Sequence, residues 1–305
     1  MDPLSDVLSL LKVQSVLSAR FEGRGAWSMR FPPYRHIKFG GVLEGVFWLW
    51  IEGTTSPVRL EAGDFYLLTT GAAYCSATQP VLAPLDGRLI FDTHKEADGV
   101  VRYGAGDDKV TAAGGRLTFD DATADILLDQ LPPLVHLPAA SRGATPLPAI
   151  LDLLASETNT LQPGSLISAA SIANVVLVHV LRAHLASTPQ PVGWLGALID
   201  PRIGQALASM HGDLARRWTV ADLAHACGMS RTSFAQRFKA RVGVPPLDYL
   251  LRWRMAVAGA LLKNSEKSIA TVAASVGYAS DTAFNSAFKR TIGESPGRHR
   301  ISGRA

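Results

Sequence analysis

The sequence has few of the residues that build disulfide-linked folds or metal sites. Its 305 residues include only two cysteines, Cys75 and Cys227, and no CxxC spacing. Disulfide bonds and a structural zinc site are therefore not expected, and this cysteine content fits a reducing cytoplasm. The N-terminal residues also lack the basic segment and apolar stretch of a secretory signal, so we expect a cytoplasmic protein.

Long hydrophobic runs are scarce as well. The most apolar run, near Ile172 to Leu181, includes Asn174 and His179 and is shorter than the ~20 residues that cross a bilayer. No membrane partner is therefore expected. The 47% hydrophobic content nevertheless suits buried cores, and a length of 305 residues favours two domains.

The C-terminal third contains one pattern that occurs twice. Seven residues recur at an offset of 50 positions, which indicates two copies of one supersecondary unit. Each copy predicts a short helix, a glycine turn at Gly228 or Gly277, and a second helix capped by serine, which is the helix-turn-helix pattern. The matched residues are Ser230, Thr232, Phe234, Phe238, Lys239, Gly243 and Pro246 in the first copy and Ser280, Thr282, Phe284, Phe288, Lys289, Gly293 and Pro296 in the second.

The second helix of each copy has an aromatic face and a polar, basic face. At ~100° per residue, its two phenylalanines lie one turn apart on one side. Simple solvation explains a polar face on one helix, but two copies with matching Thr and Lys favour a binding role. The polar faces consist of Thr232, Gln236 and Lys239 in the first copy and Thr282, Ser286 and Lys289, flanked by Asn285 and Arg290, in the second.

Positive charge is concentrated in the same region. From Trp194 to Ala305 the chain carries 16 Lys and Arg residues and, with Asp200 counted in the preceding part, six Asp and Glu residues. Residues 1–193 carry 14 Lys and Arg against 19 Asp and Glu. A basic domain with paired helices indicates nucleic-acid binding, since Lys and Arg contact phosphates and Thr, Gln, Asn and Ser reach base edges.

A long helix is predicted between the two copies. Apolar residues recur at three- and four-residue steps from Leu247 to Lys263, including Tyr249, Leu250 and Trp253. Such a helix would fix the two copies relative to each other. Both second helices could then enter successive major grooves, ~34 Å apart on one face of DNA.

These segments resemble the DNA-binding domain of the AraC/XylS family of transcriptional regulators. The resemblance rests on WTVADLAHACGMSRTSFAQRFKARVGVPPLDYL and SIATVAASVGYASDTAFNSAFKRTIGESPGRHR. It implies a bacterial regulator that binds double-stranded promoter DNA, with RNA polymerase as a further partner if the output is activation. The base-reading positions of the family fall on Thr232, Ala235, Gln236, Asp281, Thr282, Asn285 and Ser286.

Three of these positions hold residues that are poorly suited to contact bases. Ala235 and Ser286 are short and Asp281 is acidic, so their direct readout is expected to be weak, or Asp281 acts as an N-terminal helix residue. The complete predicted DNA-binding set is Arg231, Thr232, Ala235, Gln236, Lys239, Asp281, Thr282, Asn285, Ser286, Lys289 and Arg290.

The first part of the chain changes from a helix to strands. Residues 2–17 predict a short amphipathic helix, and the runs that follow are rich in β-branched and aromatic residues, with Gly, Pro and Asp between them. Many short strands predict a β-barrel or a double-sheet jelly roll. The expected strands cover residues 26–31, 37–44, 45–52, 58–60 and 65–68, with additions at 81–91 and 116–119.

The segments GVLEGVFWLWIEG and VRLEAGDFYLLTTG resemble the cupin-type sensor domain that often precedes this DNA-binding domain. The resemblance raises the alternative of a cupin metal enzyme, such as a dioxygenase or isomerase. Gly40 and Tyr74 stand where the family often has His, and His36, Glu44 and His94 do not complete a ligand set. We therefore expect no metal, no cofactor and no catalytic residue.

A barrel without metal still has room for a small-molecule effector. Alternation puts Phe47, Leu49 and Ile51 on one face of a strand and Trp48 and Trp50 on the other, but it does not say which face is interior. Arg30 could pair with an acidic effector or be a surface charge. The candidate effector-binding residues are Arg30, His36, Trp48, Trp50, Tyr66 and Tyr74.

Helices at 147–156 and 165–185 are predicted between the two domains, and the second has a wide apolar stripe. We interpret the surplus as a homodimer interface rather than pure core. The expected fold is α+β: a cupin-like jelly-roll barrel at 1–140, a helical dimerisation segment at 145–186, a linker at 187–193, and an all-α DNA-binding domain at 194–305 with units near 219–242 and 268–292. The expected function is a ligand-responsive transcriptional regulator that is not an enzyme. A β domain that serves only assembly stays open, as do the effector, the operator and the choice between activation and repression.

Overall fold

The computed structural model describes residues 2–10, 15–35, 37–54, 56–118, 131–141, 143–159, 162–188 and 193–302. These residues form two compact units. The sheet unit lies within Val13–Asp120 and Leu131–Pro189, and the helical unit lies within Met1–Lys12 and Gln190–Ala305. The first domain was predicted to begin at residue 1, but residues 1–12 belong to the helical unit. Residues 189–192 of the predicted linker lie outside the described part.

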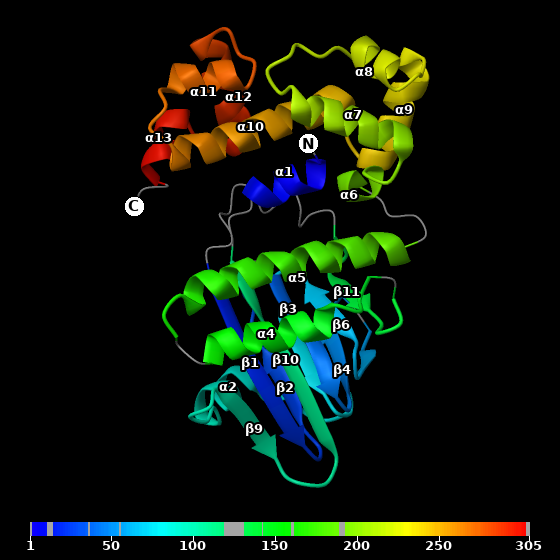
Figure 1. The fold of residues 1–305 in the computed structure, drawn as a ribbon, viewed down its shortest axis with the longest axis vertical. Helices are drawn as coiled ribbons and strands as arrows, with labels where there is room; N and C mark the ends of the chain where they lie inside the picture. Colours follow the sequence, from blue (N-terminus) through cyan, green and yellow to red (C-terminus); the bar gives the residue numbers. More distant parts are fainter. Residues whose placement is uncertain are drawn as a thin grey trace. The chain divides into compact units, whose positions relative to one another are not determined.

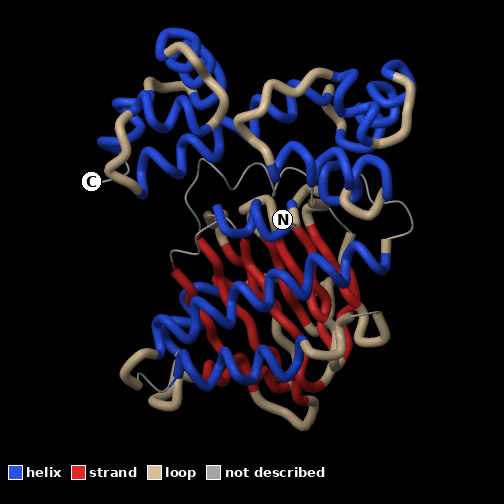
Figure 2. The backbone as a smooth tube through the Cα atoms, turned by 45° about the horizontal axis from the view of Figure 1, so that its top comes forward, coloured by secondary structure: helices blue, strands red, loops and turns tan. Residues whose placement is uncertain are grey.

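The sheet unit contains two mainly antiparallel sheets, drawn in red in Figure 2. The six-stranded sheet has the order β11-β6-β3-β10-β1-β9, and the five-stranded sheet has the order β5-β4-β7-β2-β8. The strands are β1 (Ser15–Arg24), β2 (Ser28–Phe31), β3 (Ile37–Glu44), β4 (Val46–Ile51), β5 (Val58–Glu61), β6 (Phe65–Leu68), β7 (Tyr74–Ala77), β8 (Leu85–Asp86), β9 (Val100–Gly104), β10 (Lys109–Thr118) and β11 (Leu134–Leu137).

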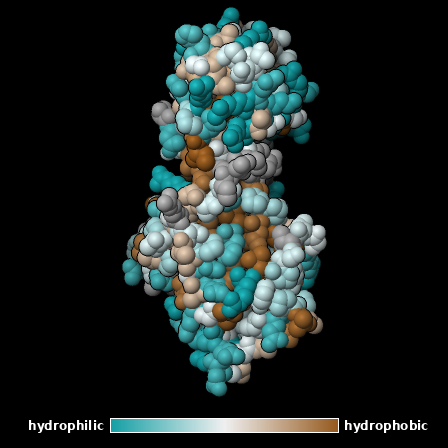
Figure 3. Space-filling view, turned by 90° about the vertical axis from the view of Figure 1, so that its right-hand side faces the viewer, coloured by the Kyte–Doolittle hydropathy of each residue, from teal (hydrophilic) through white to brown (hydrophobic). Residues whose placement is uncertain are grey.

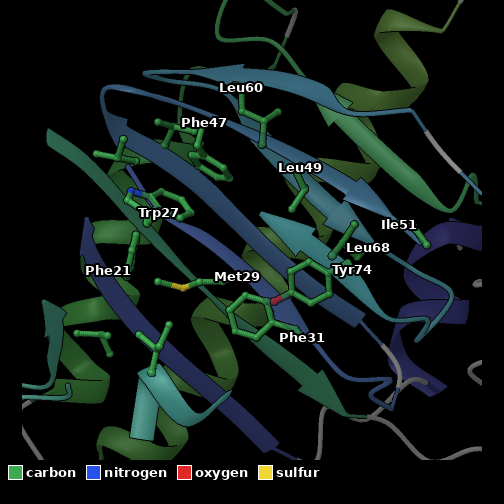
Figure 4. Packing of buried hydrophobic residues seen from close by; sticks show 14 residues of the cluster. Phe21, Trp27, Met29, Phe31, Phe47, Leu49, Ile51, Leu60, Leu68 and Tyr74 are labelled. Carbon is green, nitrogen blue, oxygen red and sulfur yellow. The ribbon is translucent and has the colours of Figure 1, made fainter. Parts of the chain in front are cut away.

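The core of this unit lies between the sheets. Figure 4 shows Phe21 of β1 and Leu68 of β6 in one cluster with Met29, Phe47 and Leu49 of the other sheet. Several aromatic rings take part in this cluster, and the phenyl ring of Phe21 meets the Trp27 ring edge-on at 5.0 Å. The two sheets remain separate among the described strands, so the predicted jelly roll is confirmed as an open double sheet rather than a closed barrel.

Strand β4 resolves the alternation that its sequence left open. Phe47, Leu49 and Ile51 are buried, whereas Trp48 and Trp50 are only half-buried on the opposite face. The aliphatic and phenyl side chains therefore point toward the core. The two indoles cover the outer side of the sheet.

Several secondary-structure predictions for the first part of the chain were wrong or incomplete. The first helix ends at Leu10, and β1 already begins at Ser15. The strand expected at 81–91 is instead the two-residue β8 followed by helix α2 (Gly87–Thr93), because Asp86 accepts hydrogen bonds from the Arg88 and Leu89 amides and caps that helix. Strands β1, β7, β9 and β11 and most of β10 were not predicted.

Strand β10 escaped prediction because of its composition. Its sequence KVTAAGGRLT has small residues where strands usually have β-branched ones. A Cβ atom at Gly114 would lie 2.5 Å from the carbonyl oxygen of Phe39 on β3. Glycine is thus required for the close approach of these two strands, which lie at the centre of the six-stranded sheet.

Helices α4 (Leu147–Asn159) and α5 (Ser165–Ser187) confirm the predicted helical segment and pack on the six-stranded sheet (Figure 1). Helix α5 has the length and composition of a membrane-crossing helix. One of its faces is buried, however, through Ala173, Val176 and Val180, while Ile167 and Val175 are exposed. It is therefore a core helix with a second, apolar face.

The helical unit consists of short helices around one long helix. Its elements are α1 (Pro3–Leu10), α6 (Gly193–Ala197), α7 (Pro201–Gly212), α8 (Val220–Ala226), α9 (Arg231–Val242), α10 (Pro246–Asn264), α11 (Ile269–Ser275), α12 (Asp281–Ile292) and α13 (Pro296–Ser302). Both predicted helix-turn-helix units are present as α8–α9 and α11–α12. The sequence did not indicate α6, α7 or α13.

Helix α1 packs against α7 and α10 within this unit. The imidazole of His211 on α7 is buried there and stacks on the Trp253 ring at 4.2 Å. Its Nε2 atom lies 2.8 Å from the Tyr249 hydroxyl, and its Nδ1 atom lies 3.3 Å from a carboxylate oxygen of Asp6 on α1. Burial lowers the pKa of His211 to about 4, and the Asp6 carboxylate opposes that shift.

Candidate DNA-binding surface and ligand cavity

The two helix-turn-helix units are built with the same local devices. Ser230 accepts a hydrogen bond from the Ser233 amide at 3.2 Å, and Ser280 accepts one from the Ala283 amide at 3.4 Å. Both second helices end in a left-handed glycine, at Gly243 with φ 89° and at Gly293 with φ 92°. The repeat in the sequence is therefore a repeat in structure.

The aromatic faces are buried in the same way in both copies. Phe234, Phe238, Phe284 and Phe288 are all fully buried, and the two rings of each pair lie 5.6 Å apart. In each helix the two buried phenylalanines, one turn apart, fix the rotation of the helix about its own axis. That rotation decides which side chains are presented outward.

The predicted DNA-binding residues lie mainly on the exposed side of both second helices. Ala235 is half-buried, and the other ten members of the predicted DNA-binding set are exposed: Arg231, Thr232, Gln236, Lys239, Asp281, Thr282, Asn285, Ser286, Lys289 and Arg290. Asp281 is the first residue of α12, where a carboxylate interacts favourably with the helix dipole. Hydrophilic residues cover most of the helical unit in the view of Figure 3.

Two arginines of α9 bind a carboxylate within the helical unit, which the sequence did not indicate. Arg237 donates through Nε and Nη2 to a carboxylate oxygen of Asp200 at 3.0 and 2.8 Å, and Arg241 lies 3.6 Å from the same oxygen. Burial alone would raise the pKa of Asp200, but hydrogen bonds from Arg237 and from the Ile203 and Arg202 amides lower it. Asp200 also caps α7, so this cluster ties α9 to the start of α7.

Helix α10 carries both units. Its residue Tyr249 contacts Phe238 of α9 with ring centroids 5.9 Å apart. Met255, Ala258 and Leu262 lie in the cluster that contains Phe284 and Phe288 of α12. The predicted connecting helix is thus present and is part of the core of each unit.

A cavity of about 430 Å³ opens in the sheet unit. Its apolar wall is made mainly of aromatic rings, and the small residues Ala112 to Gly115 of β10 leave the space that larger side chains would fill. Its polar lining residues are Lys38, Arg88, Asp92 and Arg116. The aromatic lining residues are Phe21, Phe31, Tyr34, Phe39, Tyr66, Tyr74 and Phe91.

Lys38 is the most unusual side chain of this cavity. Its ammonium lies 4.9 Å from the ring centroid of Phe31, 5.0 Å from that of Tyr34 and 4.6 Å from that of Tyr74, and it donates to the Tyr74 hydroxyl at 3.1 Å. Burial, together with the charges of Arg116 and Arg88, lowers the pKa of Lys38 to about 8. The rings contribute cation–π attraction but no negative charge.

Comparison with known proteins agrees with these two parts. Residues 2–186 match the family model described as Cupin, and residues 223–301 match the model described as a helix-turn-helix domain. A Streptomyces lividans protein named an AraC-like transcription regulator is 43% identical over 301 residues, which are 98% of each chain. The chain belongs to the AraC family of transcription regulators. The Streptomyces antibioticus protein of the same name is 41% identical over 301 residues, also 98% of each chain, and the regulator AlkR of Acinetobacter baylyi is 34% identical over 254 residues, 82% of each chain.

The structure of this AraC-family regulator divides the candidate effector-binding residues. Tyr66 and Tyr74 line the cavity. Arg30 instead forms a two-pronged ion pair with Glu52 at 2.7 and 2.9 Å and is largely exposed, and Trp48 and Trp50 lie on the outer face of β4. The residue His36 lies outside the described part. Strand alternation explains the split, because side chains two positions apart share a face and neighbours do not.

Sequence reasoning missed Lys38, Arg88 and Arg116. A usable signal existed for Lys38, since it interrupts the apolar pair Ile37 and Phe39 in a strand that the sequence did predict. Alternation puts Lys38 on the face opposite to Ile37 and Phe39, and in this structure that side chain lines the cavity. Arg88 lies in the segment 81–91, which was predicted as a strand but contains helix α2. Arg116 lies in a predicted strand, but most of β10 was not predicted, so the sequence did not indicate its cavity neighbours.

The positions at which cupins often have His do not fit a metal in this AraC-family protein. A Cβ atom at Gly40 would lie 2.5 Å from the hydroxyl of Tyr66, so that ring fills the place of a ligand side chain. Glu44 pairs with Lys109, and His94 contacts Tyr103. No group of three or more His, Cys, Asp or Glu side chains suited to a metal ion occurs within the described residues.

Proposed function

We propose that this AraC-family regulator binds double-stranded promoter DNA with α9 and α12 in successive major grooves, and that a small molecule in the sheet-unit cavity controls it. The supporting observation is that two exposed recognition faces are held by one core helix, α10. At ~1.5 Å rise per residue, the 19 residues of α10 span ~28 Å, close to the ~34 Å repeat of the major groove.

The exposed side chains divide by chemistry. Gln236 and Asn285 have the donor and acceptor pair that reads adenine edges, and Thr232 and Thr282 offer single hydroxyl contacts. Lys239, Lys289, Arg231 and Arg290 suit phosphates, which position the protein without reading sequence. Asp281 supports its own helix rather than a base.

The test is selection of bound duplexes from a random-sequence DNA library by the full chain, followed by binding of the selected duplex at several salt concentrations. Gln236→Ala should weaken binding by ~1–3 kcal/mol and relax preference at one position, and Lys289→Ala should weaken all sequences and flatten the salt dependence. Lys95→Ala, an exposed lysine of the sheet unit, is the matched control. Recovery of no enriched sequence, or an equal effect of all three variants, would contradict the proposed interface.

A homodimer is the proposed assembly. The surplus that predicted an interface is Ile172, Val175 and Val178; of these, Val175 is exposed and Ile172 is buried. Ile167 adds a further exposed apolar side chain to α5, and exposed apolar surface of this kind favours an interface. Sedimentation of the wild-type full chain and of the Ile167→Glu variant tests this. If both proteins sediment as monomers, the proposed homodimer is contradicted. RNA polymerase is the further partner if the output is activation, and the cytoplasm is the proposed location.

The protein is proposed to act without catalysis. Its relatives are named transcription regulators, and the cupin positions that often ligate metal hold Gly40 and Tyr74. Metal analysis of the purified full chain tests this. Stoichiometric iron, manganese or zinc would instead support the metal-enzyme alternative.

A further inference from the structure

The charges that line the sheet-unit cavity do not balance. Lys38, Arg88 and Arg116 line it together with the single carboxylate of Asp92, and no ion pair joins that carboxylate to any of the three cations among the described residues. Neither does any other described carboxylate lie within ion-pair distance of them. A concave site with surplus positive charge attracts an anion.

Two of these cations are also short of hydrogen-bond acceptors. The Nε atom of Arg116 is buried and has no partner within the described part of the chain. The ammonium of Lys38 carries three hydrogens, and the Tyr74 hydroxyl accepts only one of them. Buried donors without acceptors are costly, so both point to an acceptor that the protein itself does not supply.

The remainder of the cavity lining is mainly aromatic, with uncharged tyrosine hydroxyls. The rings of Phe31 and Phe91 meet edge-on at 5.4 Å, and the Phe21 and Phe91 rings stack at 5.7 Å. Burial raises the pKa of Tyr66 to about 12, so this phenol is neutral and adds no charge. At ~30 Å³ per water-sized group, about 430 Å³ holds on the order of a dozen non-hydrogen atoms.

We propose that the effector is an apolar monocarboxylate, a ring or chain of about a dozen heavy atoms, whose carboxylate lies between Lys38 and Arg116 and whose body lies among the aromatic rings. A carboxylate supplies the acceptors that Lys38 and the Arg116 Nε atom lack, and it offsets the surplus charge. Its apolar body replaces water against the rings and the floor of β10. This inference deepens the proposed ligand control of the regulator and rests on it only for the effect on DNA.

Isothermal titration of the full chain with three matched probes tests the ligand class. The probes are 1-naphthoate, 1-naphthalenemethanol and 1-naphthylmethylammonium, with octanoate as the flexible counterpart of the first. The carboxylates should bind at least tenfold tighter than the alcohol, and the ammonium should bind weakest. Equal binding of the three naphthyl probes, or binding of none of them up to the solubility limit, would overturn the proposal.

Substitutions then test the residues. Lys38→Met should lower 1-naphthoate affinity at least tenfold and leave the alcohol unchanged, Lys38→Arg should restore part of the loss, and Lys95→Met should change nothing. Melting curves of each variant establish that it folds. An equal loss for carboxylate and alcohol in Lys38→Met would mean that Lys38 only shapes the cavity, and would overturn the assignment.

A gel shift with the selected duplex, with and without 1-naphthoate, separates ligand binding from ligand control of DNA binding. Carboxylate-selective binding with unchanged DNA affinity would support the ligand class and contradict ligand control. Failure of the DNA library selection with intact carboxylate binding would contradict the DNA interface alone.

Discussion

Replacing Asp200 should loosen the first recognition helix even though Asp200 lies outside it. The side chain caps α7 by accepting from the Arg202 and Ile203 amides at 3.1 and 3.2 Å, and it binds Arg237 of α9. Asp200→Asn keeps a good capping side chain but removes the charge. Asp200→Ala removes both.

The two variants should therefore differ by the capping contribution. Hydrogen bonds to a charged group are worth ~1.5–3 kcal/mol, but the Arg237 side chain is 43% exposed, so solvent screening reduces the pair to ~1–2 kcal/mol. Loss of a helix cap adds ~1 kcal/mol. At ~4 °C per kcal/mol for a unit of this size, Asp200→Asn should lower the melting temperature of the helical unit by ~4–8 °C and Asp200→Ala by ~8–12 °C.

Calorimetry of the full chain gives the melting temperature, and hydrogen exchange read by mass spectrometry locates the change in α7 and α9. In an Arg237→Ala background, Asp200→Asn should cost much less, because its main partner is gone. Asp200 has a depressed pKa when folded, so its contribution is present above the ordinary Asp pKa of ~3.9 and is lost as pH falls through the folded value. Equal melting of Asp200→Asn and wild type at pH 7, or additive losses in the double variant, would refute the reasoning.

Three further outcomes follow from the same structure. Phe284→Ala should destabilise the helical unit by ~3–5 kcal/mol in chemical denaturation, whereas exposed Asn285→Ala should change it little; a reversed order would mean the helix is rotated. Gly114→Ala should destabilise the sheet unit by ~1–3 kcal/mol and lower its melting temperature, because the new Cβ meets a backbone oxygen of β3. An unchanged melting temperature would contradict that close approach. Titration of 1-naphthoate should weaken as pH rises above about 8, because Lys38, which faces Tyr34, Tyr74, Arg88 and Arg116, loses its proton there in the free protein; a flat profile from pH 7 to 9 would exclude its charge from binding.

The helical unit was the more predictable half, for a physical reason. Its information is local: serine caps, left-handed glycines and phenylalanines one turn apart all act within a dozen residues, and the duplication supplies the same evidence twice. The exposed faces followed directly from the buried ones. The pairing of Arg237 with Asp200 was not predicted, because Asp200 lies 37 positions away and nothing local marks the pair.

The sheet unit depended on contacts that no local pattern contains. Strand β10 pairs with β1 and β3 from far along the chain, and its glycines are explained only by the neighbour that approaches them. The aromatic strand β4 was found, but its inward face was not, since alternation is symmetric. Tyr66 and Tyr74 were named as aromatic candidates. The three rings around Lys38 come from distant segments, so its local sequence did not show that they surround it.

The place of α1 has a practical meaning for anyone who handles this protein. Its buried residues Leu4 and Val7 belong to the helical unit, so the first dozen residues complete the unit that carries α9 and α12. A fragment that starts after the sheet unit leaves the aromatic stack of His211 and Trp253 without its cover.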